Sequence, residues 1–239
     1  MINKEFISRS PLRILEKSTQ GGVGKGNIGI IAARKGVGKT ACLVHIATDQ
    51  LFQGKNIIHV SFAANTSYIV SWYESIFQEI ARRYNINGAM DTYDQIAKNR
   101  VIMNFKQDGL TIGRVLSSIK SMIGDGGFAT DVVVVDGYDF SKSTAEEFAQ
   151  FKTFASELQL ELWFSATTHR DDPSKDDKGV PMILSPFMGS TAILILMVPR
   201  DGYIHLQLVK DHDIFPSPDS LYLRLDPQVM LIAEAEVGR

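Results

Sequence analysis

A run of eight residues near the start of the chain combines glycines, a lysine and a hydroxyl side chain in an order suited to phosphate binding. It reads Ala33-Arg34-Lys35-Gly36-Val37-Gly38-Lys39-Thr40, followed by Ala41, and matches the relaxed Walker A pattern with alanine in place of the first glycine. A glycine-rich turn lets several backbone amides approach one polyphosphate, and the helix that follows points its positive dipole end at the same place. We therefore expect residues 33–41 to bind nucleotide phosphates, with the Lys39 amine on the terminal phosphates and the Thr40 hydroxyl on Mg²⁺.

An aspartate at the end of a very apolar run supplies the second half of this predicted site. Asp136 directly follows four valines at 132–135, which suit a strand buried on both faces. A buried carboxylate is costly unless it is paired, and Mg²⁺ reached through water is its expected partner. The alternative for Asp136 is an aspartate that only caps a turn, since Gly137 follows. Asp139 is a weaker candidate for the metal-binding role, and its alternative is likewise a capping residue. We expect Asp136 and Thr40 to hold the metal together.

The elements that must position these residues alternate between apolar runs and helical spacing. Apolar runs at 27–33, 56–62, 100–105, 132–136 and 160–165 predict buried strands. Helical spacing follows the phosphate-loop candidate as far as Gly54 and recurs over 67–83, over 111–123, and after a predicted Thr144–Glu147 capping box. Past Arg170 only strand-like segments remain, at 191–198, 203–209, 221–225 and 229–233. This order predicts an α/β fold with a mostly parallel central sheet, helices on both faces and a C-terminal antiparallel β extension.

Length and composition set the class of protein. The 239 residues, 44% hydrophobic and 22% charged, predict one globular domain: an arm and loop over 1–26, a β/α core over 27–170, a mobile loop over 171–189 and a β meander over 190–239. The net charge of -2 is not that of a dedicated nucleic-acid coat protein, although it does not exclude a local basic groove. The single cysteine, Cys42, excludes an internal disulfide. The apolar runs are too short to cross a bilayer and the N-terminus lacks a secretory h-region, so a soluble cytoplasmic protein is the default expectation.

Several of these segments resemble a known family. The segment GIIAARKGVGKTACLVHIA resembles the P-loop region of the RecA-like ATPases, most closely the ATPase domain of DnaB-type replicative helicases. VVVVDGYD is similar to that family's Walker B strand, and FKTFASELQLELWFSATTHR to its next helix and strand, which end in a polar sensor. LVKDHDIFPSPDSLYLRLDP is similar to the C-terminal hairpin that reaches a neighbouring subunit's nucleotide. The resemblance implies a RecA-like fold over most of the chain, ATP and Mg²⁺ as ligands, a homo-oligomeric ring or filament, and a nucleotide contact for Lys210 and His212.

The departures from that family concern hydrolysis. The place of its catalytic glutamate, just after the second strand, reads VSFAAN at 60–65 without a carboxylate, and Glu74 lies further on. Ala166 stands where the sensor glutamine is usual, and His212 replaces the arginine finger while Lys210 is kept. Because a finger supplies on the order of 10³-fold or more in rate, its loss predicts slow hydrolysis. His169 and Arg170, at the end of the sensor strand, are either a γ-phosphate sensor or an ordinary exposed strand end.

Three functional hypotheses follow. The first is an Mg-ATP-binding RecA-like domain with weak or slow ATPase activity, acting as a nucleotide-dependent switch or assembly module, in which γ-phosphate orders loop 170–181. The second is a DNA-dependent ATPase, a helicase or recombinase-like motor, although the four aspartates of loop 170–181 outnumber its three basic residues and disfavour contacts with nucleic-acid phosphates. The third is a non-catalytic interaction domain, which the joint presence of Lys39, Thr40 and Asp136 disfavours. ATP rather than GTP is the default by resemblance.

Overall fold

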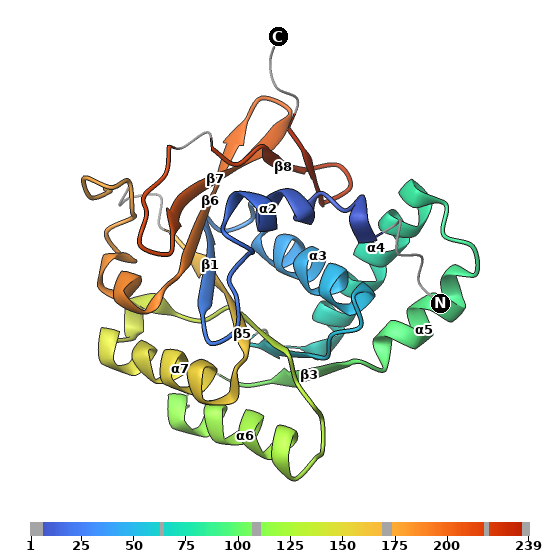
Figure 1. Ribbon diagram of the computed structural model, residues 1–239, viewed down its shortest axis with the longest axis horizontal. Helices are drawn as coiled ribbons and strands as arrows, with labels where there is room; N and C mark the ends of the chain where they lie inside the picture. Colours follow the sequence, from blue (N-terminus) through green and yellow to red (C-terminus); the bar gives the residue numbers. More distant parts are fainter. Residues whose placement is uncertain (1–6, 63–64, 107–110, 169–173, 218–219, 236–239) are drawn as a thin grey trace.

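A single sheet of nine strands runs through the computed structural model, which describes residues 7–62, 65–106, 111–168, 174–217 and 220–235. The strand order is β3-β2-β4-β5-β1-β6-β7-β8-β9 (Figure 1). The strands are β1 (Ile28–Ala33), β2 (Ile57–Ser61), β3 (Arg100–Asn104), β4 (Val132–Asp136), β5 (Glu161–Thr167), β6 (Ile193–Arg200), β7 (Tyr203–Asp211), β8 (Leu223–Asp226) and β9 (Leu231–Glu234).

The sheet has a parallel part and an antiparallel part. Strands β3, β2, β4, β5, β1 and β6 pair in parallel, whereas β6–β7, β7–β8 and β8–β9 pair antiparallel. The predicted α/β class, with a mostly parallel sheet and a C-terminal antiparallel extension, is therefore confirmed. Strand β5 lies between β1 and β4, so the strand that leads into the predicted phosphate loop is not hydrogen-bonded to the strand that ends in Asp136.

Helices cover both faces of the sheet, as predicted. They are α2 (Leu12–Ser18), α3 (Lys39–Phe52), α4 (Thr66–Tyr84), α5 (Ala89–Ala97), α6 (Ile112–Gly124) and α7 (Ala145–Leu158), with 3₁₀ helices η1 (Phe140–Lys142) and η2 (Ser185–Ser190). Buried apolar residues of α2, α3 and α4 form one core on one face, and those of α6, α7 and η2 form a second core on the other (Figure 1). None of the described helices is both long enough and apolar enough to span a bilayer.

Local sequence patterns correctly predicted most of these helices and strands. The Thr144 side chain accepts from the Glu147 amide at 3.2 Å and Glu147 returns the bond to the Thr144 amide at 2.9 Å, which confirms the capping box at the start of α7. Helices α2 and α5 were not predicted, because α5 buries only Ile96 and α2 is a helix of 7 residues. Part of the segment predicted as a loop over 171–189 forms η2, and residues 169–173 lie outside the described part of the chain.

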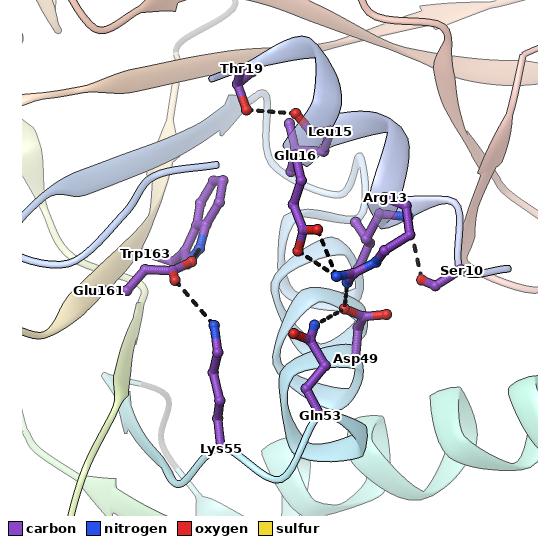
Figure 2. Close-up of polar contacts among 11 residues, drawn as sticks. Ser10, Arg13, Leu15, Glu16, Thr19, Asp49, Gln53, Lys55, Glu161 and Trp163 are labelled. Carbon is purple, nitrogen blue, oxygen red and sulfur yellow. Dashed lines mark hydrogen bonds and ion pairs between the residues drawn. The ribbon is translucent and has the colours of Figure 1, made fainter. Parts of the chain in front are cut away.

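Charged side chains attach α2 to α3, and a separate ion pair lies nearby at the start of β5 (Figure 2). Arg13 contacts both Glu16 and Asp49 of α3, and Lys55 lies 3.7 Å from the Glu161 carboxylate at the start of β5. Burial raises the pKa of Asp49, and the Arg13 guanidinium opposes that shift. The N-terminal arm is thereby attached to the C-terminal half of α3.

A second glycine-rich string, Gly22-Val23-Gly24-Lys25-Gly26, lies between α2 and β1. It precedes β1, whereas the Walker A-like residues follow that strand. The two strings are therefore separated by a strand of 6 residues, which spans roughly 20 Å. The second string is a loop, as predicted, and it does not line the pocket described below.

Candidate functional site

The Walker A-like residues form a tight turn between β1 and α3. Gly36 and Gly38 adopt φ values of 81° and 107°, which only glycine reaches without strain. A Cβ on Gly38 would also lie 2.8 Å from Leu225 Cδ2 of β8. Gly38 is the N-cap of α3 and supplies no side-chain cap, and the first helical bond runs from the Cys42 amide to the Gly38 carbonyl at 2.9 Å. The amides of the first turn have no intrahelical acceptor, and they lie at the positive end of the helix dipole.

Thr40 and Asp136, which lie 96 residues apart in the sequence, are hydrogen-bonded to each other. The Thr40 hydroxyl donates to Asp136 Oδ2 at 2.8 Å. The Ser165 hydroxyl of β5 donates to the other oxygen, Oδ1, at 2.6 Å and accepts from the Gly137 amide at 2.9 Å. The Asp136 side chain is buried. The hydroxyl and the carboxylate predicted as metal ligands are therefore adjacent.

The Lys39 amine folds back over the turn. Its Nζ donates to the carbonyls of Ala33 and Arg34, each at 3.1 Å. Burial lowers the pKa of Lys39, and the negative charge of Asp136 partly opposes the shift. The amine, the helix N-terminus and the Asp136 carboxylate thus surround one small region.

A pocket of about 340 Å³ opens over this region. Three aromatic residues line it: Phe62 after β2, and Tyr68 and Trp72 from α4, which we call the aromatic wall. The Tyr68 and Trp72 rings meet edge to face, with centroids 6.3 Å apart, and Tyr68 is 48% exposed. Met230, from the turn between β8 and β9, also reaches the pocket. The remaining lining residues are Lys35, Gly36, Gly38, Lys39, Thr40, Asp136, Gly137, Ser165 and Thr167.

Some predicted nucleotide-binding residues do not line this pocket. Ala41 is buried, Val37 packs against the core, and Ala33 and Arg34 contribute carbonyls to Lys39. These residues shape the turn rather than face the pocket.

Lys210 and His212 also lie outside this pocket. The Lys210 amine is directed into its own chain, where it donates to the Met188 carbonyl at 2.8 Å and to the Thr191 carbonyl. Burial is the main cause of the lowered pKa of Lys210. His212 Nδ1 lies 2.7 Å from Asp211 Oδ1. Neither side chain lines the pocket, and their contact with a neighbouring subunit stays a prediction.

Several residues of the pocket were missed by sequence reasoning. Ser165 interrupts an otherwise apolar strand, and this was the one signal that could have indicated its contact with Asp136. The aromatic wall carried no distinctive signal, because Trp72 also fits the buried face of a helix. Met230 comes from a turn almost 200 residues away from the predicted phosphate loop, so no local pattern relates the two.

Other candidates have structural roles. The Asp139 side chain caps η1 through the Ser141 amide, which confirms its interpretation as a capping residue. His45 accepts from the Ile232 amide at 2.8 Å, and His59 Nδ1 lies 3.0 Å from the Tyr73 hydroxyl, both in the core. The aromatic residues of 148–154 are buried in the core. Glu74 is exposed on α4, whereas His169 and Arg170 lie outside the described residues.

The donor set can be compared with the needs of a metal ion. Within the described part of the chain, no group of three or more His, Cys, Asp or Glu side chains could hold one. Mg²⁺ commonly takes only one or two carboxylates and completes its shell with water and substrate phosphates. One hydroxyl and one carboxylate beside a helix N-terminus fit that pattern, whereas they do not fit a site built from protein ligands alone.

Comparison with known proteins assigns no family. No protein-family model matches the chain, and no curated protein sequence matches it significantly.

Proposed function

We propose that this chain is an Mg-ATP-binding domain of the RecA-like P-loop class, similar to the ATPase domain of DnaB-type helicases, and that it works as a nucleotide-dependent switch or assembly module. One observation carries the proposal. The Thr40 hydroxyl meets the buried Asp136 carboxylate at 2.8 Å, at the N-terminus of a glycine-capped helix and beside the Lys39 amine. Glycines, amine, hydroxyl and carboxylate are the groups that a metal-bound polyphosphate needs, and here they meet at one place.

Each group has a distinct part in binding. The amides around Gly36 and Gly38 and the first turn of α3 would face the phosphates. The Lys39 amine now donates to two neutral carbonyls, and phosphate oxygens are stronger acceptors because they are charged. Thr40 and Asp136 would hold Mg²⁺, which when bound neutralises part of the phosphate charge.

The aromatic wall supports a nucleotide rather than a bare phosphate. Tyr68 and Trp72 lie in the same pocket as Lys39, so a base attached to the phosphates has a flat apolar surface within reach. Stacking on aromatic side chains tolerates any base, because every base has a π-face. The wall therefore favours a nucleotide, and ATP follows from the family resemblance.

The same pocket favours binding over turnover. Asp136 is the only carboxylate among the lining residues that the structure describes, and both its oxygens already accept hydrogen bonds. A general base must lie within hydrogen-bond reach of the attacking water. The described lining residues include no second carboxylate that could act as this base. We therefore expect slow hydrolysis, which suits a switch better than a motor.

The test is a calorimetric titration of ATP with Mg²⁺ into the wild type, Lys39→Ala and Lys25→Ala. Lys25 is the matched control, an exposed lysine of the second glycine-rich string at the far end of β1. Removing a charged hydrogen-bond donor costs about 1.5–3 kcal/mol, so Lys39→Ala should weaken ATP binding about tenfold or more, while Lys25→Ala should bind normally. Equal affinity in the wild type and Lys39→Ala, or no binding by the wild type, contradicts the proposal.

A phosphate-release assay on the same samples separates a switch from a motor. In the described part of the loop that follows β5, two charged residues make contacts within the chain. Asp176 accepts from the amides of Lys178 and Val180, and the Lys178 amine lies 4.4 Å from the centre of the Phe215 ring. We expect slow release that single-stranded DNA does not change. Strong stimulation by DNA would replace the switch with the DNA-dependent ATPase.

A further inference from the structure

Ser165 contacts the proposed metal-binding carboxylate from the side opposite Thr40. It lies on β5, between the strands that carry the phosphate loop and Asp136, and its side chain is buried. Its hydroxyl donates to Asp136 Oδ1 at 2.6 Å and accepts from the Gly137 amide at 2.9 Å. One side chain therefore fixes both the carboxylate and the peptide that follows it.

The Asp136 carboxylate needs such a contact to keep one orientation. The terminal torsion of an aspartate is broad and roughly two-fold, so the rotamer alone does not aim its oxygens. In this structure the orientation is set by two donors, Thr40 on Oδ2 and Ser165 on Oδ1. A metal ion held by Thr40 and Asp136 would take the place of the first contact. The contact with Ser165 lies on the other oxygen and can persist.

We propose that Ser165 is a positioning residue, which holds the Asp136 carboxylate with Oδ2 directed toward Thr40 and thereby strengthens metal-dependent nucleotide binding. The inference rests on the proposed function, since it assigns a role within the same site. Partners that orient metal ligands affect metal affinity strongly, and their removal typically costs 10–100-fold. Ser165 acts through Asp136, so its effect should fall on the metal and not on the phosphates.

The experiment measures a metal factor, defined as the ATP association constant in Mg²⁺ divided by that in EDTA, by calorimetry on the full chain. For Ser165→Ala we expect the metal factor to fall about tenfold or more, with the EDTA affinity unchanged within about twofold. Ser165→Thr keeps the hydroxyl and should restore most of the factor. Thr48→Val is the control, because it removes another buried hydroxyl, which donates to the Val44 carbonyl within α3 at 2.7 Å.

The outcomes separate this inference from the proposed function. If the wild type binds ATP with a large metal factor and Ser165→Ala keeps it, Ser165 has no positioning role although the nucleotide site stands. If the wild type binds no ATP, or binds it without a metal factor, both fail. Should Ser165→Ala not fold, Ser165→Cys decides, because its thiol is a weaker donor of similar size. An unchanged metal factor in Ser165→Cys then overturns the role.

Discussion

Gly38 of the predicted phosphate loop packs against Leu225 of β8, so closely that an added Cβ would lie 2.8 Å from the Leu225 side chain. Leu225 is fully buried, and β8 belongs to the antiparallel end of the sheet. The turn expected to bind phosphate is therefore packed against an element from the other end of the chain. Its geometry depends on that packing as well as on its own glycines.

We predict that Gly38→Ala destabilises the protein and abolishes ATP binding. An alanine at a φ of 107° costs about 1–2 kcal/mol, and the contact with Leu225 adds about 1–3 kcal/mol of overpacking. Gly54→Ala is the control, because Gly54 has a φ of 81° with open space around a Cβ. Urea unfolding should show a clearly larger loss of unfolding free energy for Gly38→Ala than for Gly54→Ala.

A double-mutant cycle isolates the contact between the two residues. Leu225→Ala alone leaves a cavity and should cost about 2–5 kcal/mol. In the double variant the truncated Leu225 makes room for the new methyl group. The sum of the stability losses of the two single variants should therefore exceed the loss measured for the double variant. Strict additivity would show that the clash is relieved elsewhere and would leave only the backbone strain at Gly38.

The part of the site that was predictable from sequence is the part with local causes. The glycine-rich turn before Lys39 follows an apolar run and precedes helical spacing, and the four valines before Asp136 favour a buried strand by their own preference. The hydrogen bond of 2.8 Å between the Thr40 hydroxyl and the Asp136 carboxylate depends on β1 and β4 ending at the same edge of the sheet, with β5 between them. The contact of Ser165 is a consequence of that strand order, which no local pattern encodes.

The contacts of the Lys210 side chain also depend on tertiary packing. The family resemblance implied that its amine contacts a neighbouring subunit's nucleotide, and that contact stays a prediction. Within this chain the amine donates to two carbonyls around η2, a segment that the sequence pattern did not indicate as structured. Likewise Tyr68 and Trp72 of α4 line the same pocket as Met230 and the predicted phosphate loop, and no local sequence pattern indicates that these segments come together.

We predict that the aromatic wall binds the base and not the phosphates. Trp72→Ala should weaken ATP binding by about 1–3 kcal/mol, the range for loss of base stacking on an aromatic ring, and Tyr68→Ala should act in the same direction. Neither change should affect the affinity for inorganic tripolyphosphate, which has no base. Competition titrations with both ligands measure the difference. Equal losses for ATP and tripolyphosphate would mean that the wall only supports the turn.

We predict an acid sensitivity that originates at His45, a buried residue of α3 that does not line the pocket. Its Nδ1 accepts from the Ile232 amide, which attaches β9 to α3, and burial lowers its pKa from 6.5 to about 3. Between about pH 3 and pH 6.5, the unfolded chain therefore binds a proton at this histidine and the folded chain does not. The free energy of unfolding falls as the pH drops below about 6.5. The loss is about 1.4 kcal/mol per pH unit, or about 2 kcal/mol at pH 5.

The variant His45→Asn keeps a side-chain acceptor without a titratable ring. Its unfolding free energy, measured in urea at pH 7.5 and pH 5, should vary less with pH than that of the wild type by about 2 kcal/mol. A second buried histidine, His59, has its pKa lowered to about 4 and remains in both proteins, so the comparison isolates His45. An unchanged pH dependence in His45→Asn would assign the acid sensitivity to other groups.

We predict that Cys42 reports on opening of the phosphate-loop helix. It lies one turn into α3, is buried, and burial raises the pKa of its thiol to about 12. The thiolate is the reactive form, so the folded protein should react with a disulfide reagent such as DTNB only through opening of the helix or of the whole domain. Saturating Mg²⁺ and ATP should slow this reaction by at least tenfold in the wild type, because the ligand stabilises the state in which Cys42 is buried. In Lys39→Ala, at the same ATP concentration, the protection should be much smaller. Rapid labelling that ATP does not change would show that Cys42 is reached by a motion independent of the nucleotide site.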